Sequence, residues 1–490
     1  MRATLTAILL AGLTFVLVAA LARPRQASSP VELVIWDWWS PSLTEGYRDY
    51  FNDLTRQFQE RHPGVRLRFQ FIPFSNYPQK LTTGFAGSRP PDVFQCSVAW
   101  AEGLYDRGVI LELNDLVART PDLAMDQFLP SAVRHNQKNG RIYGIPIILD
   151  ANCLIYNLDL FEQTGLPTDP YAIDSWETFL EFCRRLTVRD EAGQIVRAGY
   201  GLNSYGLSAV IFHPWLYANG GTFYDEATGE VKFHGPEGIE ALQFLLRLRD
   251  EKVVPAFSPQ LDIQEQFIAG KIAMYVDGTW SGKYIERNSE GRARFGMTNF
   301  PPGPSGHDRT TVTWANMLMI SKACRHPEAA WEFVRFVAGI EGSLLRLKHL
   351  GQNSPRKDFY DRPEWLETVK RKPYLAMVRE ICTSGSKRPS VESKAVESTF
   401  GPYFEGLLIY GKTEDVPGRL NDAAEHVGRI YRRAREFYRN GSQTPELQSH
   451  GPATTEDHSI HEQCLTRAVA PSHSEEPPLA LGGDCGKRGR

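Results

Sequence analysis

The chain has 490 residues, of which 42% are hydrophobic and 23% charged, and its formal net charge at pH 7 is -3. This length exceeds one ordinary hydrophobic core and predicts a soluble globular protein of two or three domains. The basic residues are scattered among acidic ones and the net charge is slightly negative, so we exclude nucleic acid as a partner.

The first thirty residues form an export signal. An apolar run extends from Ala3 to Ala22 and is followed by Arg23-Pro24. Small residues at Ala20 and Ala22 suit a signal peptidase, but Arg23-Pro24 is a poor sequence to follow a cut, and about 20 apolar residues can span a bilayer. We therefore expect residues 1–30 to be either a cleaved signal peptide or an uncleaved anchor of a periplasmic or otherwise extracytoplasmic protein.

The first predicted strand, from Val31 to Trp39 (VELVIWDWW), ends in three tryptophans. Ligands of open α/β sheets bind at the carboxyl ends of strands, so Trp38 and Trp39 are candidates for stacking on a sugar, whereas Trp36 is expected in the core. The other reading of Trp38 and Trp39 is that they also fill core. Alternation along the strand places Val34, Trp36 and Trp38 on one face and Ile35, Asp37 and Trp39 on the other.

Strand-like and helix-like stretches then alternate, which predicts α/β architecture. Helical spacing from Tyr47 to Phe58 stops at His62-Pro63-Gly64, and alternation from Val65 to Phe71 predicts a strand, so the opening unit is β-α-β. Asp174 and Glu177 fit a capping box at the start of a further helix.

Later helices are marked by their first and last residues. Pro236 and Pro327 are expected to open two helices, and Gly339 to end the second. The last strong helix is predicted from about Arg419 to Arg439. Residues 441–490 are rich in Ser, His, Pro, Gly and charge without apolar periodicity, so we expect a disordered tail.

The cysteines give no sign of a metal centre. There are seven, an odd number, and none lies in a CxxC pair, which argues against a zinc site and against a dense disulfide framework. We expect most of them to be small buried residues, and we expect no cofactor or metal. The seven are Cys96, Cys153, Cys183, Cys324, Cys382, Cys464 and Cys485.

Short segments in a fixed order, beginning with the leading strand, carry a family resemblance that spans about residues 31–440. The four longest after that strand are residues 85–94 (FAGSRPPDVF), 140–157 (GRIYGIPIILDANCLIYN), 267–280 (FIAGKIAMYVDGTW) and 320–337 (ISKACRHPEAAWEFVRFV), and the short pieces between them are Asp159-Leu160-Phe161, Asn219-Gly220-Gly221 and Pro301-Pro302-Gly303. Together they resemble the extracellular solute-binding proteins of ABC importers, in the sugar-binding class that includes maltose-binding protein. The resemblance implies an α/β, type II-like periplasmic-binding-protein fold: two lobes joined by hinge crossings, with a helical C-terminal segment.

The resemblance also implies where the chain passes between lobes. Residues 142–149, a continuous apolar run that contains Pro146, become the first hinge crossing, and residues 312–318 the return. The first lobe then comprises residues 31–148 and 317–362. The second lobe comprises residues 149–312 and 363–440.

Two residues match ligand-binding positions of the family directly. Trp280 matches a tryptophan of the family pocket, and Gly278 before it allows the backbone to approach a ligand closely. Asp150 falls where the maltose-binding relative has a carboxylate in its cleft, and a carboxylate accepts strong hydrogen bonds from sugar hydroxyls. The alternatives are that Trp280 anchors the next helix and that Asp150 caps or braces the hinge.

Four more residues lie in matching loops or crossings. Ser97 and Trp100 belong to the first-lobe loop, in which the family's tryptophan position is occupied by Cys96, and this difference suggests a different sugar or a shifted stacking geometry. Trp314 and Asn316 lie in the return crossing, where an indole beside an amide suits one face of a sugar and its hydroxyls.

The resemblance predicts a monomeric protein that captures a sugar or oligosaccharide between its lobes and delivers it to an ABC permease. One alternative is a secreted glycoside hydrolase, which needs two carboxyl groups about 5 to 9 Å apart. Asp92 fits a structural turn, and Asp37 and Asp277 are expected to face away from the pocket, so the sequence offers no such pair. The other alternative is a ligand-sensing partner of a membrane receptor.

Overall fold

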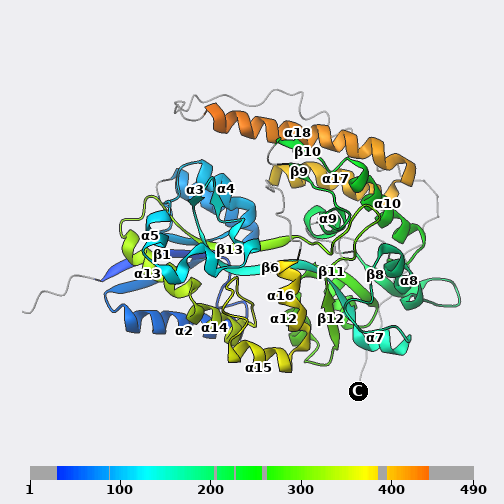
Figure 1. Cartoon of the computed structure of the whole chain (residues 1–490), viewed down its shortest axis with the longest axis horizontal. Coiled ribbons are helices and arrows are strands. Elements are labelled where there is room, and N and C mark those ends of the chain that lie inside the picture. Colours follow the sequence, from blue (N-terminus) through cyan, green and yellow to red (C-terminus); the bar gives the residue numbers. More distant parts are fainter. Residues whose placement is uncertain are drawn as a thin grey trace, which may run out of the picture. The chain divides into compact units, whose positions relative to one another are not determined.

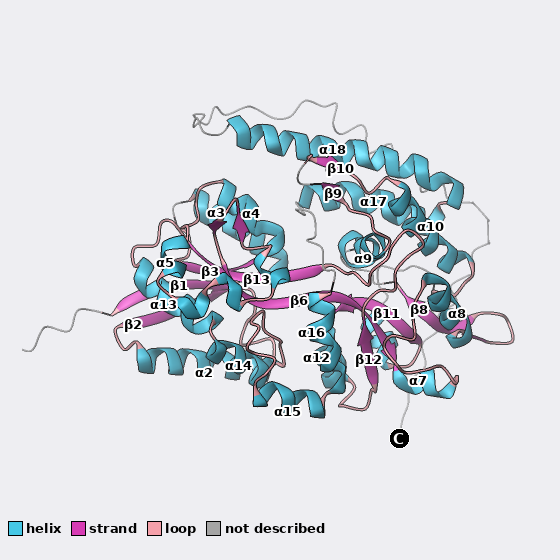
Figure 2. Cartoon of the chain, viewed as in Figure 1, coloured by secondary structure: helices cyan, strands magenta, loops and turns pink. Residues whose placement is uncertain are grey.

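The computed structural model describes residues 30–87, 89–202, 207–225, 228–255, 262–384 and 394–440. The predictions for residues 1–29 and for the tail at 441–490 concern segments outside these ranges. Helices and strands alternate along the described chain, as the sequence predicts (Figure 2). None of the helices within these ranges is long and apolar enough to cross a membrane.

One nine-stranded sheet organises the protein, in the order β2-β1-β3-β13-β6-β11-β8-β7, with β12 also paired to β6. Strands β1, β2 and β3 are parallel, whereas β13 runs antiparallel to both β3 and β6. The strands of this sheet are β1 (Val31–Asp37), β2 (Val65–Phe71), β3 (Val93–Ser97), β6 (Ile145–Asn157), β7 (Val188–Arg189), β8 (Ile195–Gly201), β11 (Ile272–Gly278), β12 (Phe295–Thr298) and β13 (Thr313–Ile320). Two small hairpin sheets pair β4 (Gln137–Lys138) with β5 (Arg141–Ile142) and β9 (Tyr224–Asp225) with β10 (Glu230–Val231).

The helices fall into two groups, and β6 passes from one to the other (Figure 1). The first group contains α2 (Glu45–Arg61), α3 (Tyr77–Ala86), α4 (Val98–Asp106), α5 (Asn114–Ala118), α6 (Pro130–Val133), α13 (Pro327–Ala338) and α14 (Ile340–Leu350). The second contains α7 (Leu158–Gln163), α8 (Trp176–Leu186), α9 (His213–Ala218), α10 (Pro236–Asp250), α11 (Ile263–Ile268), α12 (Ser281–Asn288), α15 (Pro363–Arg371), α16 (Ala376–Thr383), α17 (Lys394–Tyr410) and α18 (Val416–Asn440).

Four clusters of buried apolar side chains hold these layers together. Core A packs β1 and β13 against α2, α13 and α14, and includes Ile35, Phe58 and Val334. Core B lies on the opposite face of β1 and β3, under α3 and α4, and includes Trp36 and Phe94. Core C gathers α8, α9, α10, α17 and α18 on one face of β6. Core D places α15 and α16 on the other face.

The composition of the cores bears on the predicted lobes. Cores A and B draw their residues from 31–148 and 317–350, within the predicted first lobe. Core D combines Leu129, Leu347 and Phe359 with residues of the predicted second lobe such as Trp365. The apolar packing is therefore continuous across the predicted boundary at residue 362, and the boundaries remain a prediction.

The predicted crossings, residues 142–149 and 312–318, overlap the two longest strands of the sheet, β6 and β13. All thirteen residues of β6 are buried, and its N-terminal half pairs with β13, from Thr313 opposite Ala151 to Leu318 opposite Ile145. Pro146 lies opposite Met317, next to a register shift in β13. A proline has no N–H for a ladder hydrogen bond, which accounts for an irregular register at this point.

The local predictions for helices largely agree with the structure. Helix α2 ends at Arg61 with His62 as its C-cap, and α10 and α13 begin at Pro236 and Pro327. The predicted capping box was wrong, because the N-cap of α8 is Ser175, whose side chain accepts a hydrogen bond from the Thr178 backbone N–H. The Asp174 carboxylate instead accepts from the Thr178 hydroxyl at 2.7 Å.

The leading strand is two residues shorter than predicted. It ends at Asp37, because the Trp39 backbone N–H donates to the Asp37 carboxylate at 2.9 Å and turns the chain. The predicted alternation is confirmed, since Ile35 lies in core A whereas Trp36 and Trp38 lie in core B. Trp36 is 4% exposed and is a core residue, as expected.

Candidate ligand-binding cleft

Polar side chains interrupt the apolar face of β6 in the middle of the strand. On this face Ile148 belongs to core A and Leu154 belongs to core C, but Asp150 and Asn152 lie between them. Buried polar groups are costly unless they are hydrogen-bonded, so a polar stretch between two cores requires an explanation. Asp150 and Asn152 directly follow the predicted first crossing, and Asp150 pairs with Trp314 of the predicted return.

Strand pairing extends these polar positions into a band across neighbouring strands. Trp314 on β13 lies opposite Asp150, and Asn316 lies opposite Ser97 at the end of β3. Paired residues of a sheet point to the same face, as do residues two apart in one strand. We call this set the polar band: Asp37, Gln95, Ser97, Asn316, Trp314, Asp150 and Asn152.

Asp150 directly follows the predicted first crossing, residues 142–149, within β6. Its side chain is nearly buried and accepts a hydrogen bond from the Thr279 hydroxyl at 2.8 Å. The Thr279 backbone N–H donates to the Ala151 carbonyl at 2.9 Å, which fixes the loop after β11 against β6. Burial raises the pKa of Asp150 to about 6, and the Thr279 hydroxyl opposes this rise by stabilising the ionised form.

Trp280 follows directly and is half-buried. Its indole ring lies against the Cα of Gly278, so closely that a Cβ on Gly278 would be 2.1 to 2.2 Å from three ring atoms. Gly278 therefore has to be glycine for the ring to take this place. Among the described residues, Trp280 is assigned to none of the four cores, which is the position expected of a ring that is free to stack on a ligand.

Trp314 projects from the return crossing and is also half-buried. Part of it packs on core C, and its indole N–H donates to the Asn152 side-chain oxygen at 2.7 Å. Trp314 and Trp280 are thus attached to the two strands that flank β6 in the sheet, β13 and β11. The structure brings Trp280, Asp150 and Trp314 together around the centre of β6, and places Asn316 and Ser97 along the band from them.

The other candidate tryptophans, Trp38, Trp39 and Trp100, lie beyond the carboxyl ends of β1 and β3. Trp38 is 9% exposed and its ring is surrounded by those of Phe74, Tyr77 and Trp100, with centroids 5.6, 5.1 and 5.8 Å away. We call these four residues the aromatic edge cluster. Trp38 is enclosed within it, whereas Trp100 is half-buried and Phe74 is 56% exposed. Trp39 lies apart, with its ring 4.9 Å from that of Tyr47.

Phe74 was not anticipated from the sequence. It lies three residues after Phe71, the last residue of β2, and the rule that directed attention to Trp38 after β1 also applies to the end of β2. A single Phe in a loop that contains Pro shows no sequence pattern. Only its position after the carboxyl end of β2 could have indicated a role in ligand binding.

Asp37 faces the polar band, contrary to the expectation that it points away from the pocket. The Gln95 amide nitrogen lies 3.0 and 3.1 Å from the two Asp37 carboxylate oxygens, and Gln95 is two residues from Ser97 on β3. The Asp37 residue is partly exposed. Burial raises the pKa of Asp37 to about 7, and the positive charge of Arg346 opposes the rise.

The charges of Asp37 and Asp150 both act on the hydroxyl of Tyr47. Burial raises the pKa of the Tyr47 hydroxyl, and the negative charges of Asp37 and Asp150 raise it further. Asp37 is the last residue of β1 and Asp150 lies within β6, so the electrostatic environment of this hydroxyl includes carboxylates from two different strands. The sequence identifies Tyr47 only as an apolar position of a helix, because Asp150 is more than a hundred residues away along the chain.

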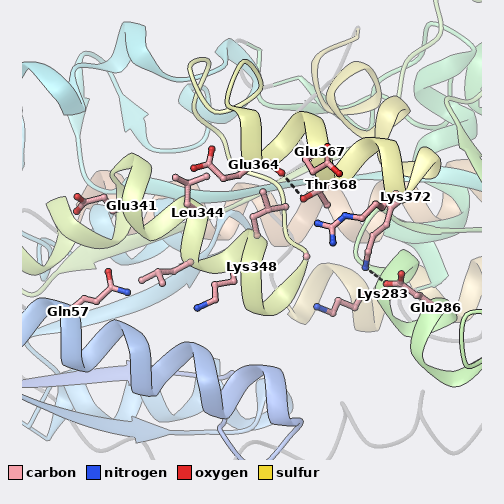
Figure 3. A pocket seen from close by; sticks show the side chains of 14 residues that line it. Gln57, Lys283, Glu286, Glu341, Leu344, Lys348, Glu364, Glu367, Thr368 and Lys372 are labelled. Carbon is pink, nitrogen blue, oxygen red and sulfur yellow. Dashed lines mark hydrogen bonds and ion pairs between the residues drawn. The ribbon is translucent and has the colours of Figure 1, made fainter.

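A separate cavity of about 970 Å³ lies among α2, α12, α14 and α15 (Figure 3). Its lining includes Lys283, Lys348, Arg371 and Lys372 together with Glu286, Glu341, Glu364 and Glu367, and it contains no aromatic residue. None of the predicted ligand-binding residues is among its lining residues. A groove of balanced charge without rings does not suit a sugar, so we place the candidate site at the polar band.

Comparison with known families identifies the class of protein. Residues 40–343 match the family model of the bacterial extracellular solute-binding proteins. The chain belongs to that family. Its members bind solutes outside the cytoplasm, and the resemblance carried by the quoted segments is confirmed.

Individual relatives agree with this assignment. The arabinooligosaccharide-binding protein of Bacillus subtilis is 21% identical over 379 residues, which cover 74% of this solute-binding protein and 82% of the relative. The mannitol-binding protein of Pseudomonas aeruginosa is 27% identical over 290 residues, or 57% and 64% of the two chains.

Solved structures show the same fold. The sugar-binding protein MalE from Xanthomonas citri superposes with a TM-score of 0.70 at 17% identity, covering 84% of this chain and 100% of that one. The cyclic α-maltosyl-1,6-maltose binding protein from Arthrobacter globiformis has a TM-score of 0.69 at 21% identity, with coverage of 82% and 100%. The predicted two-lobe α/β fold of periplasmic binding proteins is confirmed.

Proposed function

We propose that this solute-binding protein captures a sugar or oligosaccharide at the polar band and delivers it, chemically unaltered, to the permease of an ABC importer. The observation that carries the proposal is the arrangement around the centre of β6, where Asp150 lies between strands that bear Trp314 and Trp280. Names of relatives agree, since arabinooligosaccharide-, mannitol- and maltodextrin-binding proteins are among them.

The chemistry of the band suits a carbohydrate. The ionised Asp150 accepts hydrogen bonds from hydroxyl groups, and such charge-assisted bonds are stronger than neutral ones. The indoles of Trp280 and Trp314 offer apolar faces to the C–H faces of a sugar ring. Micromolar affinity corresponds to about -8 kcal/mol, and burial of apolar surface contributes roughly 25 cal/mol per Å² toward it.

The remaining predicted residues take supporting roles in this proposal. Ser97 and Asn316 offer hydroxyl and amide groups along the band, and Trp100 offers a half-buried ring at the edge of the first lobe. Trp38 acts mainly by supporting Trp100, because it is itself enclosed. Trp39 contributes by its contact with Tyr47. Asp37 and Tyr47 join the set as additional polar groups.

Binding is coupled to lobe movement in the proposed mechanism. An open form exposes the band, a sugar that bridges both lobes makes additional contacts in the closed form, and the population shifts toward closure. The closed form then presents the two lobes to the permease in a fixed relation. We place this cycle in the periplasm or an equivalent extracytoplasmic space, with the protein acting as a monomer, and residues 1–30 serving as a signal peptide or tether.

A thermal-shift screen against carbohydrates tests the proposal. The panel contains maltose, maltotriose, arabinotriose and mannitol, with glycerophosphocholine as the non-sugar arm, because a structure of that ligand with UgpB from Mycobacterium tuberculosis also shares the fold. At least one carbohydrate is expected to raise the melting temperature of the protein in a concentration-dependent way. A shift with glycerophosphocholine and with no carbohydrate contradicts the proposal.

We keep glycoside hydrolysis as a second candidate, because Asp37 and Asp150 both belong to the polar band and hydrolysis uses two carboxyl groups. Incubation of the same oligosaccharides with the protein, followed by chromatography, separates the two functions. Unchanged oligosaccharide supports binding, and shortened oligosaccharide supports hydrolysis.

A further inference from the structure

Asn152 occupies an unexpected place for an asparagine. It lies in the middle of β6, is completely buried, and has apolar neighbours on the same face beyond it, beginning with Leu154 of core C. Asparagine is depleted in strands because its amide competes with the backbone for hydrogen bonds. A leucine or valine at this position would extend core C, so packing alone does not explain the asparagine.

The side-chain oxygen of Asn152 has one partner, the indole N–H of Trp314 at 2.7 Å. This bond also fixes the orientation of the amide, because an indole N–H is only a donor and requires the oxygen to face it. The amide nitrogen is consequently turned the other way, where it is buried and has no acceptor among the described residues. An unpartnered buried donor destabilises the folded state.

The backbone of Asn152 is equally well fixed. Its N–H donates to the Val312 carbonyl at 2.9 Å, and its carbonyl accepts from the Thr311 hydroxyl at 2.7 Å. On its other side it pairs with Gly278 of β11, against which the Trp280 ring lies. Asn152 is therefore held rigidly between the two strands that carry the two candidate stacking rings.

We infer that Asn152 is a positioning residue that fixes the plane of the Trp314 indole for stacking on the ligand. Trp314 is half-buried, so one part of its ring is held by core C and the other part is held only where the N–H is anchored. Without the anchor the indole has other rotamers available, and ordering them on binding reduces affinity. This inference rests on the proposed function, and it explains why a destabilising buried amide is present.

The test compares Asn152→Leu, which removes the acceptor at similar volume, with Trp314→Phe, which removes the N–H and keeps a ring. Affinity is measured calorimetrically for maltotriose and arabinotriose. Asn152→Leu is expected to weaken the binding of whichever sugar binds the wild type by about tenfold or more. In the Trp314→Phe background, Asn152→Leu is expected to lower sugar affinity by no more than about twofold, because the indole N–H that Asn152 anchors is absent.

Thr120→Val is the matched control. The Thr120 hydroxyl accepts a hydrogen bond from the Trp331 indole N–H at 3.0 Å, which is the same chemistry in core A, away from the band. This control is expected to lower the melting temperature and leave sugar affinity unchanged. Asn152→Leu is expected to weaken sugar binding without lowering the melting temperature, because the variant also removes the unpartnered donor.

A measurement without ligand separates this inference from the proposed function. The indole N–H resonance of Trp314, assigned by its disappearance in Trp314→Phe, is expected to shift in Asn152→Leu when spectra of the empty proteins are compared. An unshifted resonance overturns the inference whether or not a sugar binds. Equal affinities of wild type and Asn152→Leu for a sugar that does bind also overturn it. Failure of the wild type to bind any carbohydrate contradicts the proposed function alone.

Discussion

Replacement of Asp150 by asparagine is expected to stabilise the empty protein while weakening its binding of sugar. The carboxylate is buried, and its pKa in the folded protein is about 6 compared with 3.8 in the absence of burial. The difference of about two pKa units corresponds to about 3 kcal/mol. Asparagine keeps the shape and an oxygen that accepts the hydrogen bond from Thr279, but it carries no charge.

The raised pKa of Asp150 determines how the stability of the folded protein changes with pH. Because the folded state holds the proton more tightly than the unfolded state, ionisation of Asp150 destabilises folding as the pH rises from 3.8 to about 6. Above that pH the full cost of about 3 kcal/mol is present, whereas linkage leaves about 1 kcal/mol at pH 4.5. Asp150→Asn should therefore gain about 3 kcal/mol over wild type at pH 8 and about 1 kcal/mol at pH 4.5.

Urea unfolding of the two empty proteins at pH 8 and pH 4.5 measures this difference. Asp277→Asn is the control, because the buried Asp277 carboxylate accepts bonds from the Ser281 hydroxyl, the Gln264 amide and the Gly278 N–H, and an asparagine loses part of this set. The control is expected to be destabilised at pH 8. A gain for Asp150→Asn that is the same at both pH values, or a loss at pH 8, refutes the argument that burial of this charge is costly.

Three further outcomes are expected. Trp280→Ala should weaken sugar binding by about tenfold or more in a titration. The melting temperature of the empty protein should stay nearly unchanged, because the ring lies outside the four cores. An equal loss of affinity and of melting temperature would make Trp280 a core residue. Gly278→Ala should weaken binding similarly, since its Cβ would displace the Trp280 ring, and wild-type affinity would show that the ring position is unimportant. Sugar affinity should fall as the pH is lowered from 7.5 to 5, because protonated Asp150 is a weaker hydrogen-bond acceptor. A dissociation constant that calorimetry finds independent of pH would exclude the ionised Asp150 carboxylate as an acceptor for the sugar.

Local sequence patterns were sufficient where the structure depends on near neighbours. Pro236 and Pro327 begin helices because a missing N–H has no cost in the first turn, and the alternation around Trp36 follows from strand geometry. The N-cap of α8 was misplaced by one residue, because Asp174 and Ser175 are both good caps and only the backbone geometry distinguishes them.

The sequence by itself determined the family and identified Trp280 and Asp150 as candidates, because these depend on short segments in a fixed order. Tertiary structure alone decided which side chains meet. Asn152 bonds to Trp314 across 162 positions of the chain, and Asp37 turns toward the band through its contact with Gln95. These side-chain contacts depend on the register between strands that are distant in sequence, and a register shift of one residue would move every side chain of the shifted strand to the other face of the sheet.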